Sequence, residues 1–462
     1  TFSLMSGGPD DCNMIKVASD NTLYVSSTNG LYKYKNGNWS NISPDNIGGF
    51  SGLSIDVNNS DVILCAGEYF SKPLPSGRTN VRNSNEIPIY YSSDGGQSWT
   101  NTIANAQKHV DITWIANTEF SAATAAVLLD PSDPKKSWFT DWFEVWMTPD
   151  ITATPVQWYT KHHGIDEMVV FQVISTPSGA NLLTGLADND GMRHTDLTSY
   201  NQKKYGTPPL QETTGIDFCE SDPNFIARVG STGWGQKGGG GYSLNNGRTW
   251  TTFPGWPANA IGYRCAVSAE NRNNIVVVPI NNDVMYTTDR GYSFKKAKGA
   301  PSGLIFGFWS TNEPLASDRV DGKKFYICAD QGFYTSSDGG ATWQLTNNTL
   351  PYSGAAKVVK AAPGIKWEVW VGYKNGGLYR SSDAGKTFTP IMKLTSLINF
   401  AFGKPAPGSN CPTVFVYASI DGERGVFRSD DMGNSWVRIN TDANKMGLTK
   451  YMAGDRQVYG RV

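Results

Sequence analysis

Short runs in which apolar and polar side chains alternate follow one another along the whole chain. Clear examples are Thr22 to Ser26, Gly30 to Tyr34, Gly332 to Ser336 and Gly377 to Ser381. Alternation with a period of two places every second side chain on the same face, which is typical of a strand that packs one face into a core. The pattern therefore predicts many short strands joined by turns.

A polar turn motif recurs at the ends of these runs. It consists of Ser or Thr, an Asp two residues later, a Gly two residues after that, and then Ser or Thr followed by an aromatic residue. The six copies, one of which has Asn245 in place of Asp, are Ser92 to Trp99, Ser243 to Trp250, Thr287 to Phe294, Ser336 to Trp343, Ser381 to Phe388 and Ser429 to Trp436. The last four aromatic residues are 49, 45 and 48 residues apart. A period of this size predicts a repeat architecture.

Every residue type of this motif has a structural task in a turn between two strands. The Asp side chain can accept hydrogen bonds from backbone N–H groups, the Gly permits a positive φ, and the aromatic residue can fill the space beneath the hairpin. A role of these Asp residues in metal binding or catalysis is the less favoured interpretation. We therefore assign the motif to the scaffold and expect Trp99, Trp250, Trp343 and Trp436 in the core.

Strand groups of about 45 residues fill the chain from residue 161 onward. They are predicted at 168–198, 214–250, 260–296, 304–345, 355–390 and 397–438, with a closing strand at Arg456 to Val462. Such groups are typical of a β-propeller, in which radially arranged sheets leave only short edges, and function then belongs to the rim loops or the central cleft. The predicted fold class is all-β, built from β-propeller repeats.

The first part of the chain holds only about three such groups, which cannot close a ring. Either residues 1–160 are a partial first propeller whose other blades lie outside the chain, or all groups close into one ring of about ten blades. We expect the first arrangement. Residues 161–450 then form a second, seven-bladed propeller, and residues 451–462 form a closing strand that returns towards the first propeller.

Composition supports the all-β prediction and narrows the function. The chain has 49 Gly, 24 Pro, 15 Trp and 21 Tyr but only 18% charged residues, which suits turns and aromatic-rich sheets better than surface helices. The net charge of −1 and the absence of a basic cluster interleaved with aromatic residues argue against nucleic acid as a partner. No apolar run approaches the roughly 18 residues of a membrane-spanning helix, so no membrane partner is expected.

The cysteines indicate neither a metal site nor a cofactor. Six Cys residues are scattered without any CxxC pair, which excludes a zinc ribbon, leaves disulfide pairing open and makes buried free thiols the plain expectation. Sequons at Asn38, Asn41, Asn58 and Asn347 suit a secreted protein, although a chain rich in Gly and Asn also produces them by chance. We expect an extracellular protein whose numbering begins after removal of a signal peptide.

One turn replaces the repeated motif with chemically different residues. The strand Leu182 to Ala187 is followed by Asp188, Asn189, Asp190 and Gly191, and then by Arg193 and His194. A sharp turn of this kind can present carboxylates at its tip. A solvated turn is one interpretation; the other is a general acid whose pKa is tuned by its neighbours, as hydrolysis of a sugar polymer requires.

Matches outside the repeated turns carry a resemblance to a known family. They include Trp39-Ser-Asn-Ile-Ser-Pro, Arg193-His-Thr-Asp-Leu, Phe225-Ile-Ala-Arg-Val-Gly, Gly425-Val-Phe-Arg-Ser-Asp-Asp and Val458-Tyr-Gly-Arg-Val. Through them the chain resembles glycoside hydrolase family 74, the xyloglucan-active endo-β-1,4-glucanases built from two seven-bladed propellers. The resemblance implies an inverting glycoside hydrolase without a cofactor that acts on a polysaccharide. Its substrate would be a neutral β-glucan held in the cleft between the propellers.

The family pattern also assigns the acid. A Gly-Asp-Ile-Gly-Gly-Phe stretch before Arg-His carries a catalytic Asp in the family, and Ala187 to Met192 takes its place here. Asp188 is therefore identified by resemblance as the general acid. Ala187 replaces the leading Gly of that stretch and Asp190 a later Gly. A second carboxylate at Asp190 could raise the pKa of the acid or alter the subsite, so Asp190, Arg193 and His194 are predicted to contact substrate.

The family's other catalytic Asp has no counterpart in this sequence. It lies in a Thr-Asp-Ile-Gly-Gly-Ala-Tyr-Arg-Trp stretch that does not occur here. Because an inverting enzyme needs a second carboxylate about 6.5–9.5 Å from the acid, we expect this group on a missing N-terminal segment or on a second chain that completes the first propeller. A protein that acts alone would have to recruit another acid, for which Asp141 and Asp111 are candidates.

Aromatic residues in loops are candidate sugar platforms, because neutral sugars are bound by stacking and hydrogen bonds rather than by charge. Trp234 lies in a Gly-rich loop with little strand packing to explain it, and Trp309 and Trp256 are further candidates. The competing hypothesis is a non-catalytic propeller that binds glycans or proteins, as sortilin-like receptors do. It is favoured by the missing carboxylate and by the near-ten count of groups. The Cys-rich module that follows such receptor propellers is absent from the sequence.

Overall fold

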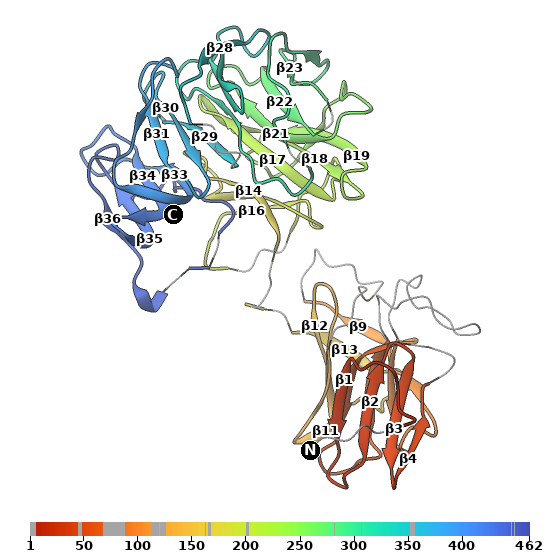
Figure 1. Ribbon diagram of the computed structural model, residues 1–462. Helices are drawn as coiled ribbons and strands as arrows, with labels where there is room; N and C mark the ends of the chain where they lie inside the picture. Colours follow the sequence, from red (N-terminus) through yellow and green to blue (C-terminus); the bar gives the residue numbers. More distant parts are fainter. Residues whose placement is uncertain are drawn as a thin grey trace. The chain divides into compact units, whose positions relative to one another are not determined.

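The chain folds into two units, each built from β-sheets (Figure 1). The computed structural model describes residues 6–44, 49–67, 88–111, 120, 126–161, 163–164, 168–199, 203–280, 282–305, 307–351, 356–444, 446–447 and 449–462. Unit 1 spans Thr1–Glu167 and unit 2 spans Met168–Val462, whereas the sequence led us to expect the boundary between residues 160 and 161.

The described residues of unit 1 form three sheets, in line with the about three strand groups expected from the sequence for this part of the chain. The first is formed by β1 (Met14–Val17), β2 (Leu23–Ser27), β3 (Gly30–Lys35) and β4 (Asn38–Asn41). The second is formed by β5 (Phe50–Ile55), β6 (Ile63–Gly67), β7 (Ile89–Ser92) and β8 (Thr100–Asn101). The third is formed by β10 (Val127–Asp130), β11 (Asp133–Thr140), β12 (Val145–Thr148) and β13 (Gln157–Thr160), with β9 (Gln107–His109) added in parallel to β13.

The described residues of unit 2 form six sheets, and each of them lies at one predicted strand group, with ends that differ by a few residues in three of the six. The first three are β14 (Val170–Ile174), β15 (Leu182–Leu186) and β16 (Gly191–His194); β17 (Glu212–Cys219), β18 (Asp222–Thr232), β19 (Lys237–Ser243) and β20 (Thr251–Thr252); and β21 (Gly262–Val267), β22 (Ile275–Pro279), β23 (Met285–Thr287) and β24 (Lys295–Lys296). The other three are β25 (Leu315–Ser317), β26 (Phe325–Ala329), β27 (Gly332–Ser336) and β28 (Gln344–Asn347); β29 (Lys357–Ala361), β30 (Val369–Tyr373), β31 (Leu378–Ser381) and β32 (Thr389–Pro390); and β33 (Leu394–Gly403), β34 (Thr413–Ile420), β35 (Glu423–Ser429) and β36 (Val437–Arg438). A short 3-10 helix, η2 (Asp442–Asn444), follows β36.

The strands of each sheet follow sequence order in unit 2, so every sheet is a simple antiparallel meander. Such sheets pack face to face on their neighbours, and the all-β propeller fold predicted from the sequence is confirmed. The seven-blade count stays a prediction, because the described residues of unit 2 form six sheets. The first of them has three strands, and a single antiparallel bridge from Met192 to Lys204 lies where a fourth strand would pair.

Burial decreases from the first to the last strand of a sheet in unit 2. All eight residues of β17 and all six residues of β21 are buried, whereas both residues of β20 and of β24 are exposed. A strand covered by neighbouring sheets on both faces has no polar side and reads as a continuous buried run. The alternating pattern of the sequence therefore marks the outer strands better than the inner ones.

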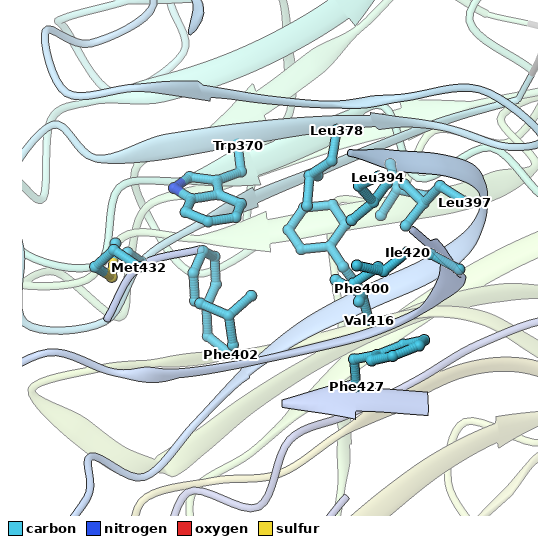
Figure 2. Packing of buried hydrophobic residues seen from close by; sticks show 14 residues of the cluster. Trp370, Leu378, Leu394, Leu397, Phe400, Phe402, Val416, Ile420, Phe427 and Met432 are labelled. Atoms are coloured by element: carbon cyan, nitrogen blue, oxygen red, sulfur yellow. The ribbon is translucent and has the colours of Figure 1, made fainter. Parts of the chain in front are cut away.

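The core of unit 2 lies between consecutive sheets. Figure 2 shows the part between the last two sheets, where the indole of Trp370 on β30 packs against the ring of Phe402 on β33. The two ring centroids are 5.5 Å apart and the planes are inclined at 82°, the edge-to-face arrangement that aromatic rings prefer. Aliphatic residues from β31, β33 and β34 complete this cluster. Each sheet thus depends on its neighbour for a core.

The six repeated turns have the geometry that their sequence predicts. In the Ser336 copy, the amide of Gly340 donates to Ser336 Oγ at 2.9 Å, and the amide of Thr342 donates to Asp338 Oδ1 at 2.9 Å. The same pair of contacts recurs in every copy. The motif's Gly has a φ between 78° and 89° in all six. The scaffold assignment of the motif is therefore confirmed.

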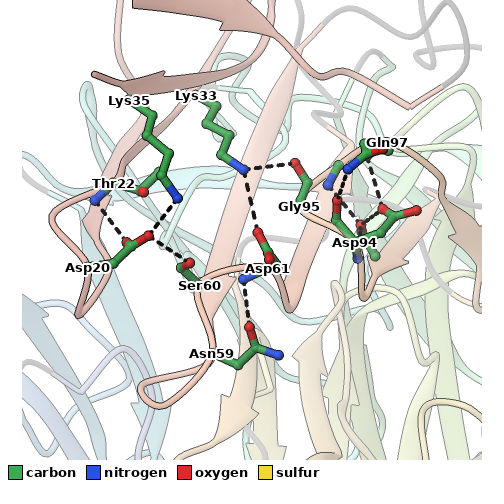
Figure 3. A network of polar contacts seen from close by, with 12 residues as sticks. Asp20, Thr22, Lys33, Lys35, Asn59, Ser60, Asp61, Asp94, Gly95 and Gln97 are labelled. Atoms are coloured by element: carbon green, nitrogen blue, oxygen red, sulfur yellow. Dashed lines mark hydrogen bonds and ion pairs between the residues drawn. The ribbon is translucent and has the colours of Figure 1, made fainter. Parts of the chain in front are cut away.

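The aromatic residues of the motif pack against the core, but to different depths. Trp250 and Trp343 are buried, whereas Trp99 and Trp436 are partly buried and cover the edges of their clusters. Figure 3 shows one of these turns in unit 1, where Asp94 holds its own loop while Lys33 reaches the carbonyl of Gly95 from the neighbouring sheet. The turns therefore join sheets as well as close hairpins.

The C-terminal residues close the ring of unit 2, but not as the strand that the sequence predicted. Residues 451–462 contain no strand. The amide of Lys404, after β33 in the last sheet, donates to Asp455 O at 2.7 Å, and Gln457 Nε2 donates to the carbonyls of Thr176 and Ala180 in the first sheet at 3.0 Å. Side-chain contacts and turns replace the ladder hydrogen bonds of a strand here. The segment connects the first and last sheets of the unit.

The inner strands of unit 2 surround a central cavity of about 120 Å³. Arg264, Glu313, Arg319 and Lys360 line it together with residues of the C-terminal segment. Four cysteines are buried and all six are free, in agreement with the expected buried thiols. No helix in the described part of the chain is long and apolar enough to cross a membrane.

Candidate active site

Asp188 lies in a tight turn between β15 and β16, which we call the acid turn (residues 187–190). The amide of Leu186 donates to the carbonyl of Asp190 at 2.9 Å, so the chain reverses within four residues. Asp188 and Asp190 have φ values of 62° and 59°. Asn and Asp tolerate this left-handed region better than other residues with a side chain. The Asp-Asn-Asp sequence therefore suits the turn conformation irrespective of any chemistry.

The carboxyl of Asp188 is half-buried, and burial raises its pKa above the ordinary value. A side-chain hydrogen bond from Gln211 opposes this effect by stabilising the ionised form. A carboxyl group that keeps its proton at higher pH is suited to act as a general acid. The environment of Asp188 therefore fits the role that the sequence predicted.

Asp190 is placed differently from our expectation. Its side chain is buried, with 2% of the residue exposed, and it forms an ion pair with Arg228, which is itself fully buried. Thr213 Oγ1 donates to Asp190 Oδ1 at 2.6 Å. Burial raises the pKa of Asp190, and the charge of Arg228 counteracts this rise. The carboxylate of Asp190 thus joins two sheets inside the scaffold, and its contact with substrate stays a prediction.

Arg193 and His194 lie at the far end of β16. Leu182 at the start of β15 pairs with His194, whereas Gly185 near the end of β15 pairs with Gly191. Arg193 and His194 therefore lie at the end of the hairpin that is opposite the acid turn. Arg193 Nε donates to the carbonyl of Asn246 at 2.7 Å and so binds a repeated turn of the next sheet. Burial lowers the pKa of His194. Contact of either residue with substrate stays a prediction.

Trp234 and Trp309, two of the three predicted platform residues, come together at one exposed place. Trp234 lies in the turn between β18 and β19, which we call the platform turn (residues 233–235), and Trp309 lies before β25. They are 44% and 55% exposed, and their ring centroids are 5.6 Å apart. Phe308 packs against both rings.

The exposed aromatic cluster is supported from below. Buried Phe171 stacks on Trp309 with centroids 5.6 Å apart and planes inclined at 19°. The hydroxyl of Tyr263 on β21 donates to the carbonyl of Phe308 at 2.8 Å and holds the loop in place. A cluster of large aromatic rings with exposed faces, held by buried neighbours, is the arrangement that sugar stacking requires.

Trp256, the third predicted platform residue, belongs to the core instead. Its ring stacks on buried Phe253 with centroids 6.2 Å apart, and its edge meets Phe294 at 5.4 Å. Its indole N–H donates to the carbonyl of Ala260 at 2.9 Å. Trp256 lies between the second and third sheets, where it packs with Phe294, the aromatic residue of a repeated turn.

Two residues that sequence reasoning missed, Gln211 and Glu212, join the acid turn to the platform turn. Glu212 is fully buried at the start of β17, where Ser231 Oγ donates to its Oε2 at 2.6 Å. The amide of Gly233 donates to Gln211 Oε1 at 2.9 Å, and the amide of Trp234 donates to Glu212 Oε1 at 3.3 Å. Nothing in the local sequence marks this pair, since its partners lie on another turn.

The two acids considered as substitutes for the missing carboxylate serve structural contacts in unit 1. Asp111 accepts a hydrogen bond from Thr160 Oγ1 at 2.7 Å and lies 2.8 Å from His163 Nε2. Asp141 accepts the amide of Glu144 and the indole N–H of Trp146, at 2.8 and 2.9 Å. Both carboxylates thus have structural partners, and a catalytic role for either stays a prediction.

Within the described residues no three His, Cys, Asp or Glu side chains converge closely enough to hold a metal ion.

Comparison with known proteins identifies relatives for nearly the whole chain. A xyloglucanase of Acetivibrio thermocellus is 30% identical over 93% of this chain and 52% of its own length. A xyloglucanase of a Paenibacillus species is 28% identical over 96% of this chain and 46% of its own length. No protein-family profile matches the chain. The chain thus spans about half the length of the curated relatives that it matches.

A solved structure agrees with these relatives. The crystal structure of a glycoside hydrolase family 74 enzyme from Niastella koreensis superposes with a TM-score of 0.78 at 25% identity, over 96% of this chain and 64% of that one. Fold and sequence therefore point to the same family over the same residues. The resemblance to glycoside hydrolase family 74 is confirmed.

Proposed function

We propose, on the premise that this chain is a homologue of the glycoside hydrolase family 74 xyloglucanases, that it cleaves the β-1,4-glucan backbone of xyloglucan or a related polysaccharide. Asp188 is the general acid in this proposal. The observation that carries it is the pairing of a half-buried carboxyl group with exposed aromatic rings on adjoining turns. A neutral polymer suits this surface, and the chain's net charge is only −1.

In this proposal the two Trp residues bind the substrate and Asp188 donates the proton. Trp234 and Trp309 stack on the faces of glucose units and fix the chain of sugars at the rim of unit 2. The protonated carboxyl of Asp188 donates its proton to the glycosidic oxygen as the bond to the anomeric carbon breaks. Burial favours the protonated form of Asp188 before this step, and the hydrogen bond from Gln211 stabilises the carboxylate after it.

An inverting reaction also needs a carboxylate that removes a proton from the attacking water. We assign this group to a segment or a second chain beyond these 462 residues that completes the first propeller. Support comes from the sequence, which lacks the family's second Asp motif. Hydrolysis of xyloglucan by the 462-residue chain alone would contradict this part of the proposal and leave the role of Asp188 intact.

The experiment that tests the proposal compares Asp188→Asn with Asp196→Asn in the complete enzyme, using xyloglucan as substrate. Asp196 is an exposed residue two positions after β16 that accepts its hydrogen bonds from Thr198, so it is a matched control. Loss of a general acid lowers the release of reducing ends about 100-fold or more, and the control variant keeps wild-type activity. Unchanged activity of Asp188→Asn removes Asp188 from the mechanism. Binding of xyloglucan without cleavage by the wild type would favour the non-catalytic alternative.

The proposal includes an extracellular location, since a polysaccharide of this size is met outside the cell. Fractionation of the source organism tests it: we expect the protein in the culture medium, and recovery only from the cell interior would contradict it.

A further inference from the structure

Gln211, just before β17, and Glu212, its first residue, contact both the acid turn and the platform turn. Gln211 hydrogen-bonds to the carboxyl of Asp188 and accepts the amide of Gly233. Glu212 accepts the amide of Trp234, and its carboxylate interacts electrostatically with Asp188. Asp190 pairs with Glu212 in a parallel bridge, so the backbones of the acid turn and of β17 are held together as well.

We propose that Gln211 and Glu212 form a clamp of positioning residues that couples the carboxyl of Asp188 to the turn that carries Trp234. The inference deepens the proposed function and rests on it, because it concerns the same acid and the same platform. Neither residue touches the reacting atoms in this proposal. They act through Asp188 and through the backbone of the platform turn.

The burial of Glu212 is the main argument for a task beyond packing. A fully buried carboxylate is unfavourable unless its charge is compensated, and Glu212 has only two described donors, Ser231 Oγ and the amide of Trp234. Ser231 Oγ donates to Oε2 and the amide of Trp234 donates to Oε1, so both carboxylate oxygens are in use. Glu212 therefore connects the start of β17 to β18 and to the platform turn at the same time.

The charge acts on Asp188. Burial raises the pKa of Glu212, and the negative charge of Asp188 raises it further, while the hydrogen bonds from Ser231 and Trp234 lower it. Repulsion between two carboxylates is mutual, so a charge on Glu212 also favours the protonated form of Asp188. Gln211 has the opposite effect, because its amide donates to the ionised form of Asp188.

The other charged groups around the site do not replace this coupling. Asp190 belongs to a buried ion pair with Arg228, and Lys204 favours the ionised form of Asp190. Gln211 acts on Asp188, whereas Ser231, the backbone of Trp234 and the charge of Asp188 act on Glu212. The clamp thus controls the acid from one strand.

Substitutions at the two clamp residues should shift the pKa of Asp188 in opposite directions. Glu212→Gln removes a negative charge but keeps an oxygen for the amide of Trp234, so the pKa of Asp188 falls. Gln211→Leu removes the donor to ionised Asp188, so its pKa rises, and the amide of Gly233 loses its acceptor. A general loosening of the fold would move both variants in the same direction.

The titration is measured by carbon-13 NMR of the full chain labelled at the Asp carboxyl carbon, with the signal of Asp188 identified by its loss in Asp188→Asn. Glu423→Gln is the matched control, because it removes the same charge from an exposed position on β35 in another sheet. Tryptophan emission of each variant, compared with that of Trp234→Phe, reports whether the platform turn has moved. We expect unchanged emission in Glu212→Gln and altered emission in Gln211→Leu.

Shifts of equal sign in the two variants, or shifts no larger than that of Glu423→Gln, overturn the clamp. If Glu212→Gln does not fold, Gln211→Leu still decides, since a fall or no change in its pKa contradicts the inference. The alkaline limb of the pH profile of xyloglucan hydrolysis should move with the NMR shifts. NMR shifts of the expected signs in a protein that releases no reducing ends would overturn the proposed function and leave the clamp standing.

Discussion

The repeated turns and the acid turn use the same residue type in opposite ways. In the turn at Ser92, Asp94 is partly exposed and accepts hydrogen bonds from Ser92, Gln97 and Ser98. Figure 3 shows Asp94 and Gln97 of this turn. These donors lower the pKa of Asp94 to about 2, so the group is ionised at any ordinary pH. In the acid turn, burial raises the pKa of Asp188 and only the hydrogen bond of Gln211 opposes it.

The backbone conformation of a turn does not decide the chemistry of its carboxylate. Both kinds of turn place residues at positive φ: Asp188 and Asp190 at 62° and 59°, and the residues before the motif's Gly at similar values, such as 56° for Asn246. What changes is the number of donors that the turn supplies to its own carboxylate. A turn that satisfies its Asp makes scaffold, and a turn that leaves it half-buried with few donors leaves a proton available for catalysis.

Substitutions of the two Asp residues of the acid turn should change the unfolding free energy by very different amounts. Asp190→Ala leaves the fully buried guanidinium of Arg228 without its carboxylate, and breaking a buried pair costs about 3–5 kcal/mol of unfolding free energy. Asp188→Asn, at a half-exposed position, changes it by about 0.5 kcal/mol or less. Urea unfolding of both variants measures this. Equal destabilisation would mean that both residues are scaffold and would end the comparison.

A smaller effect is expected in a repeated turn, where the chain provides its own control. Asn245 stands in one copy, where its amide nitrogen donates to Thr249 Oγ1 at 2.8 Å and its oxygen accepts the amide of Thr249. Asp338→Asn should therefore be nearly neutral. Asp338→Ala removes three acceptor contacts at an exposed turn and should lower the unfolding free energy by about 1 kcal/mol.

Thermal unfolding of the two Asp338 variants against the wild type is the measurement. If the Asn variant were destabilised as much as the Ala variant, the negative charge rather than the hydrogen-bond geometry would hold the turn. Charge alone would then distinguish the repeated turns from the acid turn.

The smallest effect is a pH dependence. The folded-state pKa of Asp289 is lowered to about 2 from an ordinary value of 3.8, first by the hydrogen bond from Ser293. A carboxyl whose pKa is depressed by folding stabilises the protein above its unfolded-state pKa and loses that contribution as the pH falls towards the folded-state value. Between pH of about 5 and about 2.5, the Tm of the wild type should fall slightly more than that of Asp289→Asn. Parallel Tm curves would show that the turn does not favour the ionised form.

The outer strands and the turns were predictable because their causes are local. The Ser, Asp and Gly of each repeated turn contact one another within four residues, so the sequence states the whole interaction. The period of the motif then indicates the repeat, and the repeat indicates a propeller. The same reasoning failed for residues 451–462, where it predicted a strand. The contacts of this segment to Lys404 and Thr176 join residues that are far apart in the sequence, so local patterns do not reveal them.

The candidate site was predictable only in part, for the same reason. Asp188 was found because the repeated motif is missing there, and Trp234 because Gly residues surround it in the sequence. The sequence did not show that Trp309 would pack beside Trp234, or that Trp256 would not.

The sequence by itself determined the strands, the turns that join them and the position at which the turn chemistry changes, since each depends on neighbours within a few residues. The tertiary structure decided which carboxyl is buried with a cation and which is left half-exposed. Asp190 meets Arg228 from 38 residues away, and Asp188 meets Gln211 only because two sheets pack together. Burial and long-range pairing set the pKa of a carboxyl, and neither is written in the residues beside it.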